Sequence, residues 1–423
     1  MSQSTSPPQE GSASGSAPGS ILLFVALIVF IDMVGIGLIV PVLPGLLEEI
    51  TGQGLDKTAE IGGWLLFAYA LMQFLFAPII GGLSDRYGRR PVLLITLALL
   101  GLDYAIMAWA PTLFWLFLGR LVSGVMGASW AAANSCIADV ASPEERGKFF
   151  GVMGAAGASG FVIGPAIGGF MGEFDVRLPF IAAAALGISG AIFGFFVLKE
   201  TLPVERRRAF TLARANPLGT LIQMTRSPVV LGFITVIFFA QLAGQSQMSV
   251  WSYHTQLVLG WTEWHIGMSV ALFGVIVALV QGGLTGFVIA KLGPARTAML
   301  GFILALPAYY LFAFADASWM MVVGIVFGGL GGLTFPALQQ MMSERIAEDA
   351  QGELQGAIAS TMSITSIIGP LIMTATFGVF ADDEGLYFPG APYLLAAGLS
   401  LIAIAIAAAT IRRLVSSSAK LAV

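Results

Sequence analysis

Long apolar stretches separated by short polar segments make up almost the whole chain after residue 20. Each stretch is close to the roughly 20 residues that an α-helix needs to cross a bilayer. Twelve can be delimited, at residues 21–44, 61–83, 91–110, 112–138, 149–172, 178–198, 228–250, 265–290, 296–315, 317–341, 354–380 and 391–411. The pattern predicts an all-α membrane protein with twelve transmembrane helices.

The composition agrees with a lipid environment, because 57% of the residues are hydrophobic and only 10% are charged. A soluble domain needs a more highly charged surface. Residues 1–20 are rich in Ser, Gly and Pro without Lys or Arg, which predicts a disordered tail rather than a signal peptide. One cysteine, Cys136, and two histidines do not supply a metal cluster or a disulfide. We expect no bound metal, no cofactor and no nucleic-acid partner.

The basic residues indicate how the helices are oriented. If the N-terminus is cytoplasmic, 17 of the 20 Lys and Arg fall in cytoplasmic loops or the tail at 412–423, and two fall outside. The remaining one, Arg120, lies within the fourth apolar stretch. By the positive-inside rule, both ends of the chain are predicted to face the cytoplasm.

The chain also repeats itself at a distance of 205 residues. Pro165 recurs as Pro370, Asp139 recurs as Glu344, and eight glycines between positions 81 and 164 recur in the second half. Such a duplication predicts two pseudo-symmetric six-helix bundles, at 21–200 and 228–411, joined by a cytoplasmic linker at 201–227. A duplicated chain encloses its own pathway, which favours a monomeric transporter over an oligomeric channel. We found neither HExxH nor GxSxG on a suitable turn, which argues against an enzyme.

Three ionisable residues lie well inside predicted helices of the first half: Asp32, Asp103 and Arg120. At about 1.5 Å per residue, all three reach a layer about 17 Å from the cytoplasmic side. Buried charges are costly and usually serve a function. One aspartate could form a structural ion pair with Arg120, but the second would then be unexplained. We therefore favour proton coupling, with Asp32 as the leading proton or cationic-substrate site.

Amide side chains at membrane depth are candidate substrate contacts, because they can hydrogen-bond a polar ligand, although such amides also pair between helices. The candidates are Gln73, Asn134, Gln241, Gln245, Gln281 and Gln339. Trp251, Phe238 and Phe239 could line an apolar pocket. The two histidines, His254 and His265, are predicted to flank an outer loop in a solvated or interfacial position.

The segment Gly81-Gly-Leu-Ser-Asp85-Arg86-Tyr-Gly88-Arg89-Arg90-Pro91 combines a packing glycine, a carboxylate and a basic cluster. Contacts among Asp85, Arg86, Arg89 and Asp139 are predicted to form a latch that holds the outward-facing state. This segment resembles the signature of the major facilitator superfamily. The helix that follows Asp139 carries Gly151, Gly160, Gly164, Pro165, Gly168 and Gly169, similar to the antiporter motif of that superfamily, and implies export in exchange for protons.

Gly119-Arg120 in the fourth helix is similar to a basic motif of the same superfamily. Further strings resemble the bacterial tetracycline/proton antiporters, among them Ile31-Asp32-Met-Val-Gly35-Ile-Gly37, Leu102-Asp103-Tyr104, Ile137-Ala138-Asp139 and Pro336-Ala-Leu-Gln339. The resemblance implies the major facilitator fold, a bacterial inner-membrane location, and a requirement for Asp32, Asp85, Asp103 and Arg120. It also implies a tetracycline-type drug as substrate, and Mg²⁺ is a candidate to be carried with that drug.

The chain departs from that family at two positions, where Val277 and Ala305 stand for a histidine and an aspartate. Coupling would then rest on the first half. The alternatives are a multidrug or other small-molecule exporter of the same fold, or a symporter or facilitator.

Overall fold

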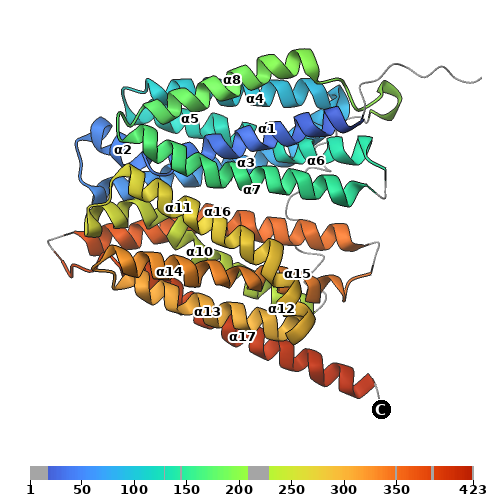
Figure 1. The fold of residues 1–423 in the computed structure, drawn as a ribbon, viewed down its shortest axis with the longest axis vertical. Coiled ribbons are helices and arrows are strands. Elements are labelled where there is room, and N and C mark those ends of the chain that lie inside the picture. The colour runs from blue at the N-terminus through green and yellow to red at the C-terminus, as the bar shows by residue number, and fades with distance from the viewer. Residues whose placement is uncertain are drawn as a thin grey trace, which may run out of the picture.

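The computed structural model describes residues 18–127, 129–142, 145–207, 228–347, 350–382 and 385–421. Most of the predicted tail at 1–20 and of the predicted linker lies outside these residues. Helices of the first half lie above those of the second half, with their long axes running across the view (Figure 1). The two halves therefore form two bundles side by side.

The described residues of the first half form eight α-helices. They are α1 (Pro18–Ile39), α2 (Leu43–Thr51), α3 (Leu55–Tyr87), α4 (Arg89–Ala108), α5 (Leu113–Met126), α6 (Ser129–Val140), α7 (Arg146–Gly172) and α8 (Leu178–Val197), followed by the 3₁₀ turn η1 (Val204–Arg206). In the second half, short 3₁₀ or π segments interrupt two of the spans. Its elements are α10 (Pro228–Leu259), α11 (Glu263–Leu279), η3 (Val280–Leu284), α12 (Thr285–Leu292), α13 (Pro294–Ala313), α14 (Ser318–Leu330), η4 (Gly331–Leu333), α15 (Thr334–Ser343), α16 (Gln351–Ala381) and α17 (Ala391–Leu421).

Eleven helical segments of the described chain are long and apolar enough to cross a membrane. This number is one below the predicted twelve because the predicted span 112–138 is divided between α5, which is apolar but short, and α6. The predicted span 21–44 is divided as well: the chain turns after α1, near Pro41, and α2 starts with Pro44 at its second position. At the other end, α17 continues to Leu421, past the boundary predicted at 411.

We name the two ends of the bundles by their elements. The α2 face carries α2 and the α7–α8, α10–α11 and α16–α17 connections, whereas the α3–α4 face carries the turn at Gly88 and the start of α7. Between the halves, α7 packs on α11 and α16 packs on α3. The cross-half polar contacts described lie at the α2 face: Ser252 Oγ donates to Val40 O at 2.9 Å, and Lys57 lies 3.8 Å from Asp382.

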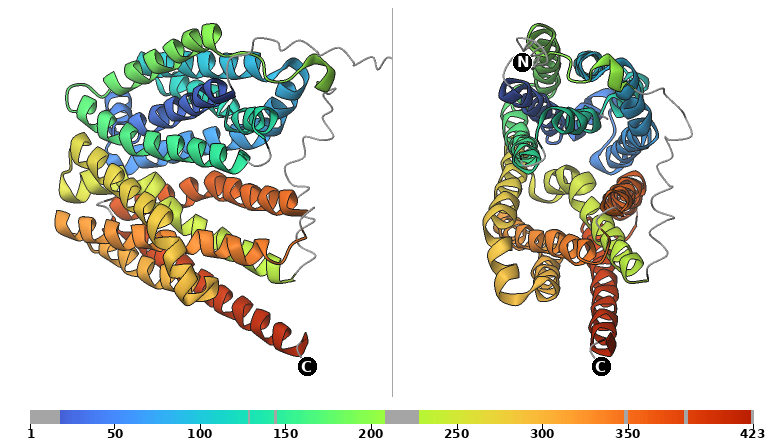
Figure 2. Two further views of the ribbon diagram at one scale, coloured as in Figure 1. Left: turned by 45° about the vertical axis from the view of Figure 1, so that its right-hand side comes forward. Right: turned by 90° about the vertical axis from the view of Figure 1, so that its right-hand side faces the viewer.

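Toward the α3–α4 face, the two halves are less closely packed. A Cβ added at Gly147, Gly151 or Gly154 of α7 would meet nothing within 4 Å. Figure 2 shows the two bundles from two further directions, one of them nearly along the helices. The structure is therefore closed between its halves at the α2 face.

The predicted repeat is visible in the backbone. Gly88, which separates α3 from α4, has φ 108° and ψ 160°, and Gly293, which separates α12 from α13, has φ 78° and ψ 160°. Pro165 lies inside α7 and its repeat partner Pro370 lies inside α16. These two helices also occupy matching places, because each packs on a helix of the opposite half.

Candidate functional site

Arg89 is the centre of the charged cluster at the α3–α4 face. Its Nε donates to Asp139 Oδ2 at 2.9 Å, and its Nη1 donates to Asp85 Oδ1 at 2.5 Å and to Ser84 Oγ at 3.2 Å. The arginine is 7% exposed. One nearly buried guanidinium thus ties the end of α3 to the end of α6, within the first half of the chain.

Glu200 also belongs to this cluster, although no pattern in the sequence indicated it. Its carboxylate accepts the backbone N–H of Arg89 at 2.8 Å and that of Arg90 at 3.3 Å, the first two residues of α4. A carboxylate at a helix N-terminus satisfies free N–H groups and complements the helix dipole. A Cβ at Gly88 would collide with this carboxylate, so glycine is needed both for its backbone angles and for space.

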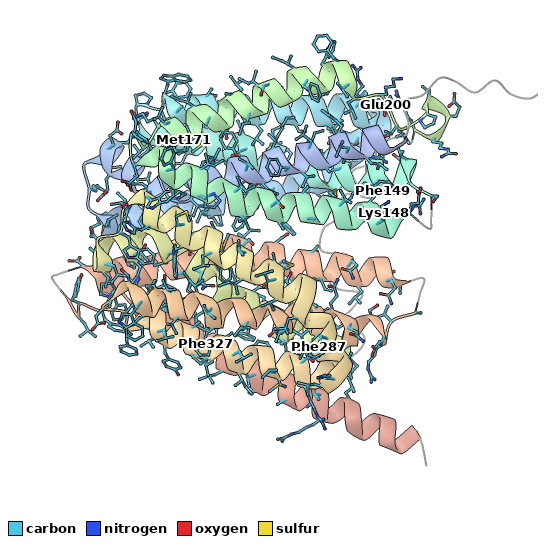
Figure 3. All side chains as sticks on the ribbon, viewed as in Figure 1. Lys148, Phe149, Met171, Glu200, Phe287 and Phe327 are labelled. Atoms are coloured by element: carbon cyan, nitrogen blue, oxygen red, sulfur yellow. The ribbon has the colours of Figure 1, made fainter. Side chains whose placement is uncertain are left out.

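The remaining residues of the segment Gly81–Pro91 make other contacts. Arg86 is exposed and stacks over the ring of Tyr87 at 5.1 Å, while Arg90 Nη2 donates to Phe195 O near the end of α8 at 2.6 Å. Gly81 was interpreted as a packing glycine, but a Cβ there would meet nothing within 4 Å, so that interpretation is wrong for this conformation. Figure 3 places Glu200 and Lys148 at the same end of the first half.

Asp103 and Arg120 form a pair inside the first bundle. Arg120 Nη2 lies 3.8 Å from Asp103 Oδ2 and 2.7 Å from Met107 Sδ, and Asp103 is fully buried. Gly119 makes room for this pair, since a Cβ at that position would lie 2.5 Å from Asp103 Oδ1. The two charges share a layer, as their positions along α4 and α5 predict.

Asp32 lies on α1 and is 3% exposed. Tyr104 is buried beside Gly35, one turn along α1, and the charges of Asp32, Asp103 and Arg120 all act on it. They also act on Tyr69, whose ring centre is 5.8 Å from the Arg120 guanidinium. Both tyrosines are therefore close enough to Asp32 and Asp103 to feel the charge of either carboxylate.

The glycines of α7 lie on two sides of the helix, one against α1 and the other against α11. A Cβ at Gly160 would lie 2.6 Å from Phe30 O, one at Gly164 would lie 2.7 Å from Val34 O, and Gly168 abuts Leu38 in the same way. This four-residue spacing lets α7 and α1 approach closely. On the adjacent side, Pro165 and Gly169 touch α11 of the other half. Gly151 is different, because it faces open space.

Two cavities lie along α10. The first, of about 230 Å³, is lined by Gln241, Gln245, Trp251 and Phe273, and by Val40 and Phe161 of the opposite half. The second, of about 260 Å³, is lined by Gln241, Gln281, Tyr309 and other residues of the second half. Val277 and Ala305, the two departures from the tetracycline antiporters, both line the second cavity.

Three of the six candidate amides thus reach a cavity, and three lie elsewhere. Gln73 Nε2 donates to Gly127 O at 3.0 Å, Gln339 Nε2 donates to Gln355 Oε1 at 3.1 Å near the α3–α4 face, and Asn134 is half-buried on α6. Of the aromatic candidates, Trp251 lines the first cavity, whereas Phe238 and Phe239 contact each other edge to face.

The prediction of a solvated or interfacial position is wrong for His254, which is buried. Because α10 continues to Leu259, nine residues past the predicted end, His254 is 1% exposed and its ring packs against Tyr393 at 5.0 Å. His265 is exposed, and its Nδ1 is 2.9 Å from Thr262 Oγ1.

Two bundles of membrane-length helices around shared cavities define a polytopic transporter. The sequence model of the Major Facilitator Superfamily matches residues 25–296 and 282–422, so the chain belongs to this family. It is therefore a multi-pass membrane protein of a transporter family rather than an enzyme.

Named relatives cover most of the chain. It is 40% identical to the class C tetracycline resistance protein of Escherichia coli, over 88% of this chain and 93% of that protein. It is also 40% identical to the class G protein of Vibrio anguillarum, over 86% and 91%. Among solved structures, a bacterial homologue of the human lysosomal transporter Spinster has a TM-score of 0.76 at 18% identity, over 95% of this chain and 98% of that one.

Proposed function

We propose that this chain is a secondary active transporter that exports tetracycline-type antibiotics across the bacterial inner membrane in exchange for protons. One observation carries the proposal: a cavity rich in amides and aromatic rings lies along α10, while a buried carboxylate–guanidinium pair lies in the other bundle. The first suits a polycyclic ligand and the second suits a proton. The names of the relatives favour tetracyclines as the ligand.

The α3–α4 face is the cytoplasmic one in this proposal, because the sequence places 17 of 20 basic residues on that side. The drug enters from the cytoplasm while the α2 face is closed. Rocking of the two bundles then breaks the cross-half contacts at the α2 face and brings the opposite ends together. Protonation of Asp32 or Asp103 from outside returns the protein to the state described.

The Arg89 cluster requires a change to the predicted latch. Its contacts are made here while the halves meet at the α2 face, which is the inward-facing state in this orientation. The cluster therefore does not by itself hold the outward-facing state. We propose that it fixes the ends of α3, α4 and α6 so that the first bundle moves as one body.

Proton release from energised inside-out vesicles on addition of tetracycline tests the proposal. We expect release by the wild type and its loss in Asp32→Asn or Asp103→Asn, with the variants present in the membrane at normal amounts. If both variants still release protons, neither carboxylate is required for proton coupling. If tetracycline gives no release, the same vesicles treated with phenicols and lipophilic cations test the alternative of another drug exporter.

A further inference from the structure

The two cavities along α10 adjoin, because they share Gln241, Gly244 and Phe273. Their combined wall spans α7, α10, α11 and the helices of the second half around η4. None of the described residues that line it is Asp, Glu, His, Lys or Arg. A ligand in this space therefore meets a wall without formal charge.

The wall offers hydrogen bonds and flat apolar surfaces instead. Gln241, Gln245 and Gln281 each bring an amide that can both donate and accept. Trp251, whose Nε1 donates to Ser269 Oγ at 2.9 Å, lines the first cavity together with the aromatic rings of Phe161 and Phe273. These features fit a planar polycyclic molecule with hydroxyl and carbonyl groups along its edge.

The intramembrane charges lie in other places. Asp32 and Asp103 are on α1 and α4, with exposed fractions of 3% and 0%, and Asp103 faces Arg120. None of the three lines either cavity. The proton-binding candidates thus lie inside the first bundle and outside the walls of both cavities.

This separation bears on the form in which the substrate is carried. Mg²⁺ prefers carboxylate or phosphate oxygens, and a positively charged complex loses hydration in a wall that offers no opposite charge. We propose that this transporter carries its substrate as a metal-free molecule whose charges sum to zero. The inference rests on the proposed export of a polycyclic drug.

The charge balance gives the inference a second consequence. If one net-neutral drug molecule leaves for each proton that enters, one positive charge crosses the membrane per cycle. A monovalent metal–drug cation exchanged for one proton would move no net charge. Transport of a metal-free drug is therefore driven by the membrane potential as well as by the pH difference.

The test uses the purified full-length chain in proteoliposomes with an acidic lumen and tetracycline outside. We expect equal initial uptake rates with MgCl₂ and with EDTA. We also expect a lumen-positive potassium diffusion potential, set with valinomycin, to raise the limiting accumulation about tenfold per 59 mV. A loss of about tenfold or more in EDTA, or no response to the potential, would overturn the inference while leaving drug export in place.

Ala305 allows the charge of the wall to be changed, since it is half-buried and lines the second cavity. Ala305→Asp adds a carboxylate, and we expect its uptake to rise several-fold with MgCl₂ relative to EDTA. Ala305→Asn matches it in size without the charge and should keep the wild-type ratio. The elution profile in detergent shows whether Ala305→Asp is folded. If the folded variant keeps the wild-type ratio of uptake with MgCl₂ to uptake with EDTA, the inference is contradicted.

The same experiment separates the two proposals. Uptake that depends on Mg²⁺ would rule out a metal-free substrate but would leave the proposed function in place. No uptake of tetracycline under either condition removes the proposed function, and the inference with it. Equal uptake under both conditions together with a response to the potential supports both.

Discussion

A single nearly buried arginine organises the charged end of the first bundle. Arg89 contacts Asp85 and Asp139, which are 44% and 22% exposed, while its own side chain is 8% exposed. Its burial makes the guanidinium hard to replace by water, and the two carboxylates come from different helices. The cluster therefore links two helices through one guanidinium that pairs with two carboxylates.

Removing that cation should be much more damaging than removing its exposed neighbour. We expect Arg89→Ala to destabilise the protein by about 2 kcal/mol or more, because the loss of one partner leaves the others uncompensated. Arg86→Ala removes the same charge from an exposed position and should cost about 0.5 kcal/mol or less. Thermal unfolding in detergent and drug uptake per folded molecule measure both. Equal losses for the two variants would show that burial is irrelevant to the role of Arg89.

The two turn glycines form a matched pair for a second comparison. Gly88 and Gly293 share a backbone conformation with positive φ, so an alanine should cost about 1–3 kcal/mol at either. Only at Gly88 would the new Cβ also meet the Glu200 carboxylate, whereas at Gly293 it would meet nothing within 4 Å. We expect Gly88→Ala to lower the unfolding temperature more than Gly293→Ala. Similar losses would mean that Glu200 moves aside freely, and Glu200→Ala should then change little.

At the scale of elements, α7 packs within the first bundle and also joins that bundle to the second. Gly160, Gly164 and Gly168 bring it against α1, and Pro165 and Gly169 bring it against α11. Just beyond its end, Glu173 Oε1 accepts the backbone N–H of Trp264 at 3.0 Å. Trp264 is the second residue of α11, so a carboxylate of the first half caps a helix of the second half.

Loss of this cap should open the α2 face. We expect Glu173→Gln to shift the population away from the closed arrangement, because the charge that faces the α11 N-terminus is gone. Glu49→Gln is the control, since Glu49 lies at the same face but pairs with Arg177 inside its own half at 3.0 Å. Distances between spin labels on α8 and α13 near the α2 face report the change. An unchanged distance distribution in Glu173→Gln would rule out a gating role for the cap.

The same contact predicts a pH dependence. The Thr262 hydroxyl and the Trp264 N–H hold the pKa of Glu173 below its ordinary value of 4.5. A carboxylate whose pKa is lowered by closure favours the closed form above the ordinary value, and this contribution is lost as pH falls through the lowered pKa. The label distance should therefore lengthen with acid at pH values below 4.5 in the wild type. Glu173→Gln should lack this component, and its persistence there would assign it to another group.

For the molecule as a whole, the repeating features were the most predictable. The lengths of the apolar stretches predicted the two bundles. The 205-residue repeat places Gly88 and Gly293 at equivalent positions, and in the structure both end a helix with positive φ. The layer shared by Asp103 and Arg120 followed from counting residues along helices of known rise. These are properties of the local sequence or of its duplication, so no knowledge of the packing was needed.

What the sequence missed depends on contacts between distant segments. The carboxylate of Glu200 caps a helix that begins 111 residues earlier, and nothing near Glu200 marks it. His254 is buried because α10 runs past the end of its apolar stretch and meets Tyr393 of α17. Three of the six candidate amides line the two cavities along α10, because lining a cavity depends on which side of a helix a residue occupies, and the sequence alone does not give that side.

Alternating access makes a prediction about both ends of the molecule at once. Lys148 of α7 and Lys291 of α12 are exposed near the α3–α4 face, and Phe174 and Met268 are exposed near the α2 face. Cys136 is buried and is the one cysteine of the chain, so Cys136→Ala gives a background for spin labels at either pair. Rigid bundles that rock about a central site must shorten one distance as they lengthen the other.

We expect acid on the α2 side together with saturating drug to populate a second state. In it, the Lys148–Lys291 label distance is shorter and the Phe174–Met268 label distance is longer than in the resting protein. Asp103→Asn mimics the protonated carboxylate and should alter the balance of the two states without acid, whereas Asp175→Asn, an exposed change at the α2 face, should not. If both distances lengthen together, the bundles separate rather than rock, and the cavity along α10 would be reached by local movement of its own helices.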